Sequence, residues 1–166
     1  IWEYTPTGTI ALGTVPGLIS ELEMHNKIIY AIAKTPRTSW NLYTLSIEPL
    51  SLNSIIEDDG AMTHLSSTDT GLLFVINRES HSELHRYDPD KKESSLVENE
   101  SSYMSYPAEF QDTIFYSSLS EKGEDIYHSP IVKSTPVTYH QTDYDTPKLS
   151  IQDTHFTEKH LATELN

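Results

Sequence analysis

Cysteine is absent from this chain of 166 residues, and its absence removes several kinds of site. Disulfide bonds, zinc sites built on thiolates and cysteine nucleophiles are all excluded. Glycine is also scarce, with 6 residues, and neither Gly-x-Ser-x-Gly nor Gly-x-x-x-x-Gly-Lys occurs. The nucleophile elbow of serine hydrolases and the phosphate loop of nucleotide-binding proteins are therefore missing. We expect no catalytic residues and no cofactor in this chain.

The chain also lacks long hydrophobic runs and has few positively charged residues. No run approaches the ~20 apolar residues that a membrane-spanning helix needs. Only 11 Lys and Arg stand against 25 Asp and Glu, so the net charge is −14. A surface this acidic repels phosphate groups, and we therefore expect the domain to bind no nucleic acid and to make no direct membrane contact. The acidic clusters at 57–59 and 98–100 are more typical of solvated loops than of calcium sites, which need six to eight oxygen ligands.

What the chain does contain is a repeat. Residues 111–116 read QDTIFY, and residues 152–157 read QDTHFT, 41 positions later. Short apolar runs with the same setting stand at 28–32, 72–76 and 114–116. Each is followed by a second run, at Asn41–Tyr43, Glu83–His85 and Asp125–Tyr127, and the spacing between these runs is 42 residues. A fixed period of about 40–45 residues is typical of propeller blades.

Each repeat has room for four short strands separated by turns rich in Gly, Pro, Asp, Asn and Ser. No segment carries a sustained 3.6-residue apolar period, which argues against helical repeats. The sequence predicts an all-β protein: a β-propeller of four blades, each of about 42 residues and four strands. The expected repeats are 18–57, 62–98, 104–140, and 147–166 together with 1–12.

The fourth repeat is split between the two ends of the chain. It would take two strands from the N-terminus, at 1–4 and 9–12, and two from the C-terminus, at 148–151 and 155–158. Pairing terminal strands in one sheet closes a propeller and removes an open sheet edge, which would otherwise promote aggregation.

The repeats resemble the TolB-like units of the wider WD40-like propeller group. Their usual Ser-Pro-Asp-Gly turn before an apolar strand is similar to Ser67-Thr68-Asp69-Thr70-Gly71 here, and their Ile-Tyr or Leu-Tyr strand is similar to Leu42-Tyr43 and Ile126-Tyr127. No copy has an intact Ser-Pro-Asp-Gly, and the Trp-Asp pair of WD repeats is missing. Members of this group more often have six or more blades, so the chain also fits as part of a larger ring.

The resemblance also implies where a ligand would bind. In TolB-like blades the strand before the Asp-Gly turn is the innermost, and innermost strands line the central channel. The predicted binding residues in these strands are Glu21, His64, Tyr106 and Lys148. The alternative is that the four inner strands pack closely and leave room only for water or an ion.

Two other groups of side chains are more easily explained by structure than by function. His81 and His85 lack the Glu that follows the first His of the zinc-protease motif, so we expect an exposed His81, a packed His85 and no metal site. The recurring aromatic residues are expected to pack between blades, with a stacking surface for a ligand as the alternative. They are Trp2, Tyr30, Trp40, Tyr43, Tyr116 and Tyr127.

The sequence therefore predicts a non-enzymatic recognition, sensor or scaffold propeller that binds a protein or a small ligand. A periplasmic or secreted setting is expected from the resemblance. The alternative is an accessory domain similar to the gating propeller of prolyl-oligopeptidase-like hydrolases, with catalysis elsewhere in a longer chain. Fold alone does not decide between them, because propellers have many activities.

Overall fold

The computed structural model describes residues 1–100, 103–130 and 135–139, and the structural statements below concern these residues. This part of the chain is all-β and contains no helix, which confirms the all-β part of the prediction. It accordingly holds no helix long and apolar enough to cross a membrane.

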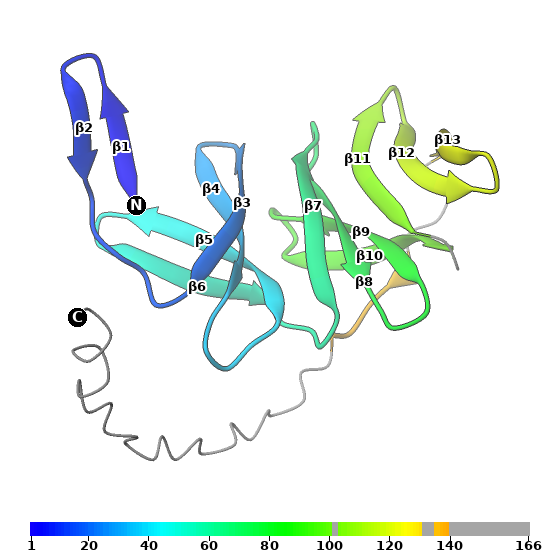
Figure 1. Ribbon diagram of the computed structural model, residues 1–166, viewed down its shortest axis with the longest axis horizontal. Helices are drawn as coiled ribbons and strands as arrows, with labels where there is room; N and C mark the ends of the chain where they lie inside the picture. The colour runs from blue at the N-terminus through cyan, green and yellow to red at the C-terminus, as the bar shows by residue number, and fades with distance from the viewer. Residues whose placement is uncertain (101–102, 131–134, 140–166) are drawn as a thin grey trace, which may run out of the picture.

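Three antiparallel sheets follow one another along the chain (Figure 1). The first sheet contains β3 (Leu18–His25), β4 (Ile28–Lys34), β5 (Trp40–Ile47) and β6 (Leu50–Ile56). The second contains β7 (Ala61–Ser67), β8 (Leu72–Asn77), β9 (Ser82–Asp88) and β10 (Glu93–Glu100). The third contains β11 (Met104–Phe110), β12 (Thr113–Ser120) and β13 (Gly123–Pro130). Within each sheet the strands pair in chain order.

The strand register shows that the 42-residue interval is a structural repeat. Asn41, Glu83 and Asp125 each begin the second of the two runs that recur in every repeat. They pair with Ala33, Ile76 and Ser118 in the strand before, so the three positions are equivalent.

Turn geometry explains two of the motifs in the repeat. Gln111 and Asp112 have φ values of 48° and 60°, the left-handed pair that a two-residue hairpin turn requires, so the QD of the repeated word is a turn between β11 and β12. Gly71 is glycine for a steric reason, because a Cβ atom there would lie 2.1 Å from the carbonyl oxygen of Tyr87. The second copy of the word, at 152–157, lies outside the described residues.

The second sheet is buried on both faces, which is why β8 is apolar at consecutive positions instead of alternating. Leu72, Phe74 and Ile76 face the first sheet, whereas Leu73 and Val75 face the third. The tyrosines Tyr30, Tyr43 and Tyr116 are buried, as expected for packing, whereas Tyr127 is exposed on one side and stacks on Tyr116. Face-to-face stacking of successive sheets is how blades pack in a propeller.

The sheets come together at their first strands. β7 contacts β3 on one side and β11 on the other (Figure 1). The described residues do not close into a ring, and the blade count stays a prediction. The outer face of the third sheet is consequently open, with Phe110, Phe115, Leu119 and Ile126 exposed.

The N-terminal residues form the hairpin that the split repeat predicts. β1 (Trp2–Thr5) and β2 (Gly8–Ala11) pair antiparallel as a two-stranded sheet. Its predicted C-terminal partners at 148–151 and 155–158 lie outside the described residues.

One strand differs from the prediction. The predicted repeat 104–140 needs a fourth strand after β13 in the third sheet, but β14 (Thr135–Pro136) pairs with β10 of the second sheet instead. The edge of β10 offers unpaired backbone groups, and the segment is fastened there by Tyr139, whose hydroxyl lies 3.1 Å from Nδ1 of His85. A proline is tolerated in this strand because the strand lies at a sheet edge.

Candidate functional site

A β-bulge interrupts the first strand of each of the three larger sheets, at the same place in β7 and β11 and one step nearer the start of the strand in β3. The extra residue falls between Ile19 and Glu21 in β3, between Thr63 and Ser66 in β7, and between Ser105 and Ala108 in β11. His64 and Tyr106 lie in these bulges with φ values of 57° and 50°. A left-handed conformation costs a residue with a side chain roughly 1–2 kcal/mol. Such strain is often found where a side chain is aimed for function.

Glu21 links the first sheet to the bulge of the second. Its Oε1 accepts the backbone N–H of His64 at 2.8 Å, and its Oε2 accepts the backbone N–H of Leu65 at 2.7 Å. The bulge releases these two N–H groups from the ladder with β8, so they are free to bind a carboxylate. Hydrogen bonds to a charged acceptor are stronger than neutral ones, and the pair fixes where β7 lies against β3.

His64 links the second sheet to the third through aromatic contacts. Its ring centroid lies 4.6 Å from that of Tyr106 and 6.3 Å from that of Tyr103, with interplanar angles of 60° and 88°. Its Nε2 lies 3.3 Å from the Tyr103 hydroxyl. Burial lowers the pKa of His64 below its usual 6.5, and the nearby charge of Glu21 opposes this shift. The imidazole is therefore neutral at neutral pH.

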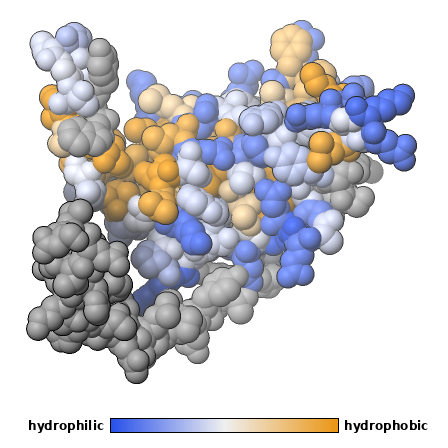
Figure 2. Space-filling model, in the orientation of Figure 1, coloured by the Kyte–Doolittle hydropathy of each residue, from blue (hydrophilic) through white to orange (hydrophobic). Residues whose placement is uncertain are grey.

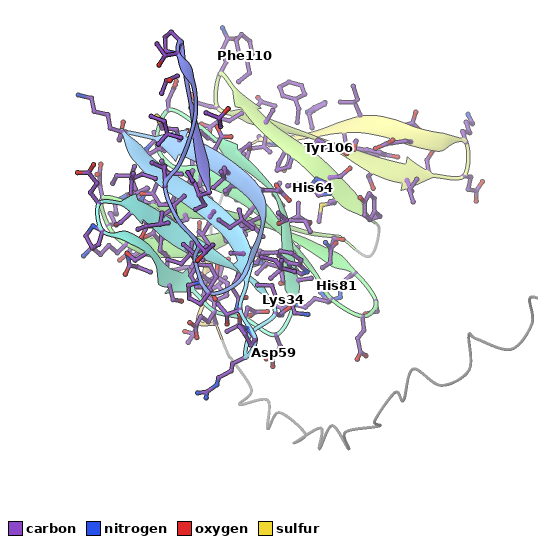
Figure 3. All side chains as sticks on the ribbon, turned by 60° about the vertical axis from the view of Figure 1, so that its left-hand side comes forward. Lys34, Asp59, His64, His81, Tyr106 and Phe110 are labelled. Carbon is purple, nitrogen blue, oxygen red and sulfur yellow. The ribbon has the colours of Figure 1, made fainter. Side chains whose placement is uncertain are left out.

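These residues line a cleft of about 480 Å³, which we call the bulge site. Its lining residues are Glu21, His64, Leu65, Ser66, Tyr106 and Pro107, and Tyr103 stands beside His64. Ser66 donates from Oγ to the Pro107 carbonyl oxygen at 2.6 Å, which fastens β7 to the bulge of β11. Figure 3 shows His64 and Tyr106 near each other, with Phe110 farther along β11.

The structure brings together three of the four predicted binding residues: Glu21, His64 and Tyr106. The fourth, Lys148, lies outside the described residues. Sequence reasoning missed Tyr103, which precedes β11 and has no equivalent in the repeat pattern. Sequence reasoning also missed Pro107. Proline cannot donate a hydrogen bond to a β-ladder, so its position directly after Tyr106 was a signal for a bulge in this strand.

A second polar cluster lies away from the bulge site and is buried more deeply. The Asp58 carboxylate, whose side chain is 5% exposed, is bound by the Arg78 guanidinium and by the Gly60 N–H at 2.7 Å. Arg78 also donates to Glu83 Oε2 at 3.0 Å. The guanidinium thus joins the loop after β6 to the start of β9.

Glu83 accepts hydrogen bonds from two histidines as well. His81 and His85 each place Nε2 3.1 Å from one of its oxygens. Burial by itself would raise the pKa of Glu83, but hydrogen bonds with His85, Arg78 and His81 lower it to about 2. Burial lowers the pKa of His85, which is 1% exposed and stacks on Phe74, although the hydrogen bond to Glu83 opposes this. The packed role expected for His85 is confirmed, whereas His81, expected to be exposed, is partly buried and held by Glu83. Among the described residues, no group of three or more His, Asp or Glu side chains is arranged to hold a metal ion.

This cluster predicts that acid destabilises the protein in two stages. Below pH 6.5 an unfolded chain protonates His85 more readily than the folded protein does, so stability falls. Glu83 stabilises the fold above its unfolded value of 4.5, and this contribution, about 3 kcal/mol, disappears as the pH falls toward 2. Urea unfolding measured from pH 7 to 3 should show both stages. A Glu83→Gln variant should be less stable at pH 7, and its free energy of unfolding should change less with pH below 4.5 than that of the parent. If the variant and the parent show the same dependence of stability on pH, Glu83 is not the group responsible for the second stage.

A wider cleft of about 710 Å³ separates parts of the first and second sheets. Its lining includes Tyr30, Ile56 and Tyr87, which also belong to the core cluster between these sheets. The rings of Tyr30 and Tyr87 meet edge-on at 6.4 Å. We interpret this cleft as a widening of the sheet interface, because its tyrosines are part of the packing.

No protein-family model matches the chain, and no curated protein matches it.

Proposed function

We propose that this protein is a non-enzymatic recognition domain that binds a protein partner or a small ligand through the bulge site, in a periplasmic or secreted setting. The observation that carries the proposal is the contrast between two sets of equivalent positions. Leu42, Leu84 and Ile126 repeat one chemistry, as structural positions do. Glu21, His64 and Tyr106 each stand two residues after Ile19, Met62 and Met104, which are equivalent in register, and they carry three different chemistries. His64 and Tyr106 lie within their bulges, whereas Glu21 directly follows the bulge of β3 and pairs with Ile32.

Backbone strain supports the same reading. A bulge that needed only a left-handed residue would be best served by glycine, which pays no steric penalty there. The chain instead places an imidazole and a phenol at these positions, and both line one cleft. A rigid scaffold that presents different side chains at equivalent places is well suited to recognition.

The fold that we propose for this function is a closed propeller of four blades. The fourth blade would combine β1 and β2 with residues 147–166 and would stand between the first and third sheets. Apolar residues on both of those sheets support this: Leu22 and Met24 on the first, and Phe110, Phe115 and others on the third, are exposed. Figure 2 shows apolar surface over both regions. A larger ring, completed by residues beyond this chain, is the alternative.

Selection from a random dodecapeptide library tests the proposed function. Peptides enriched on the parent protein should bind His64→Ala and Tyr106→Ala at least about fivefold more weakly, a loss of ~1 kcal/mol, without a matching loss of stability. Phe110→Ala is the control, because Phe110 is another exposed aromatic residue of β11 outside the cleft. Calorimetry gives the affinities, and urea unfolding gives the stabilities. Selected peptides that bind all three variants as tightly as the parent would move the binding surface elsewhere.

A further inference from the structure

We infer that the bulge site binds a cationic side chain, lysine or arginine, presented by a basic segment of a partner protein. The inference rests on the proposed recognition function and specifies its ligand. It follows from the ring geometry, the charge and the exposure of the site.

Two tyrosine rings lie close to the imidazole of His64, and one of them, Tyr106, also lines the cleft. Tyr103 and Tyr106 both stand steeply against the imidazole of His64, at 88° and 60°. The faces of aromatic rings carry negative potential and attract cations placed within about 6 Å of the ring centre. Tyr106 is the ring that lines the cleft and is also largely exposed, so its ring surface is available to a cation that enters the site.

The charge of the cleft favours the same ligand. Its lining contains a carboxylate, on Glu21, and no Lys or Arg. His64 remains neutral at neutral pH because burial lowers its pKa, so it does not repel a cation. The whole chain, at −14, attracts basic partners over longer distances.

The exposure of the rings indicates a side chain of a larger partner and not an enclosed small molecule. Tyr106 is 72% exposed and Tyr103 is 45% exposed. Sites for small molecules usually bury 70–90% of the ligand surface, which this open cleft does not. A side chain that projects from a peptide needs only one end covered.

Three short peptides test this inference: acetyl-Gly-Lys-Gly-amide, its arginine analogue and its norleucine analogue, which has a similar length and no charge. We expect the two cationic peptides to bind at least fivefold more tightly than the norleucine peptide. Their binding should shift the backbone amide signals of His64, Leu65 and Tyr106 in NMR titrations at low salt. Equal binding of the norleucine peptide would overturn the inference.

Variants separate the site from general attraction to an acidic protein. Tyr106→Leu should reduce the preference for the cationic peptides to less than twofold, whereas Tyr106→Phe, which keeps the ring, and Phe110→Leu should preserve it. A preference retained in Tyr106→Leu would show that the cations bind elsewhere and would overturn the assignment. His64→Gln supplies a second variant if Tyr106→Leu is misfolded by circular dichroism, and it should also weaken the preference.

Two further results separate a protein side chain from a free small cation, and the cationic ligand from the recognition function proposed above. Tetramethylammonium chloride that binds the site as tightly as the peptides would overturn the assignment to a protein segment. Library peptides that depend on His64 and Tyr106 but lack Lys and Arg would leave the proposed function intact and overturn only the cationic ligand.

Discussion

Deleting residues 147–166 is expected to unfold most of this protein at 37 °C. In the proposed ring these residues and the β1–β2 hairpin cover the apolar outer face of the third sheet. That face includes Phe110, Phe115, Leu119 and Ile126, all exposed in the described part of the chain. Fully burying one such side chain is worth about 1.5–3 kcal/mol, and these four are 36–81% exposed, so losing the cover costs on the order of 5 kcal/mol. This is comparable with the whole stability of a typical domain.

Thermal unfolding followed by circular dichroism measures this effect. The control is a deletion of 159–166, which begins after the last predicted strand at 155–158 and should leave the melting temperature almost unchanged. A 147–166 deletion that keeps the parent melting temperature would show that these residues do not form part of a blade. The ring would then have to be completed by other residues, as the larger-ring alternative requires.

Replacing Arg78 by methionine is expected to lower the free energy of unfolding by about 3 kcal/mol. The substitution leaves the carboxylates of Asp58 and Glu83 without their shared cation, and an uncompensated buried charge is strongly destabilising. Asp58 keeps the Gly60 N–H, and Glu83 keeps its two histidines, which places the effect at the lower end of the usual 3–5 kcal/mol. Urea unfolding at pH 7 measures the difference.

Lys91 supplies the matched control for Arg78. It forms an ion pair with Asp88 at 2.7 Å, but its side chain is 69% exposed, and exposed pairs contribute little. Lys91→Met should therefore leave the urea midpoint nearly unchanged. If Arg78→Met is no more destabilising than Lys91→Met, the buried carboxylates find other partners, and the cluster does not hold the β8–β9 turn in place.

The repeat could be predicted from the sequence because the turns and apolar runs that form each sheet depend on residues close together in the chain. Asn41, Glu83 and Asp125 occupy one register position in their sheets, at the spacing read from the sequence. The same counting led to Glu21, His64 and Tyr106, which the structure places around one cleft or at its edge. Residues one repeat apart in the sequence occupy corresponding positions in their sheets, as long as the chain follows the same path in every repeat.

Departures from the repeat could not be predicted in this way. β14 pairs with β10 instead of β13, and Tyr139 next to it reaches His85 and Ser94 of the second sheet, interactions across 45 residues or more. Tyr103 belongs to the site for a similar reason, since its hydroxyl approaches His64 from the segment before β11. Neither contact leaves a periodic signal in the chain.

The sequence by itself determined the all-β class, the period of the repeat and the place of the first strand of each larger sheet, because turn residues and apolar spacing act on neighbours along the chain. Only the tertiary structure decided that the bulges expose two N–H groups to Glu21 and aim His64 at Tyr103 and Tyr106. It likewise decided that Arg78 lies between Asp58 and Glu83. These interactions join residues from different strands, sheets or loops, so their partners are set by how the sheets pack and not by local sequence.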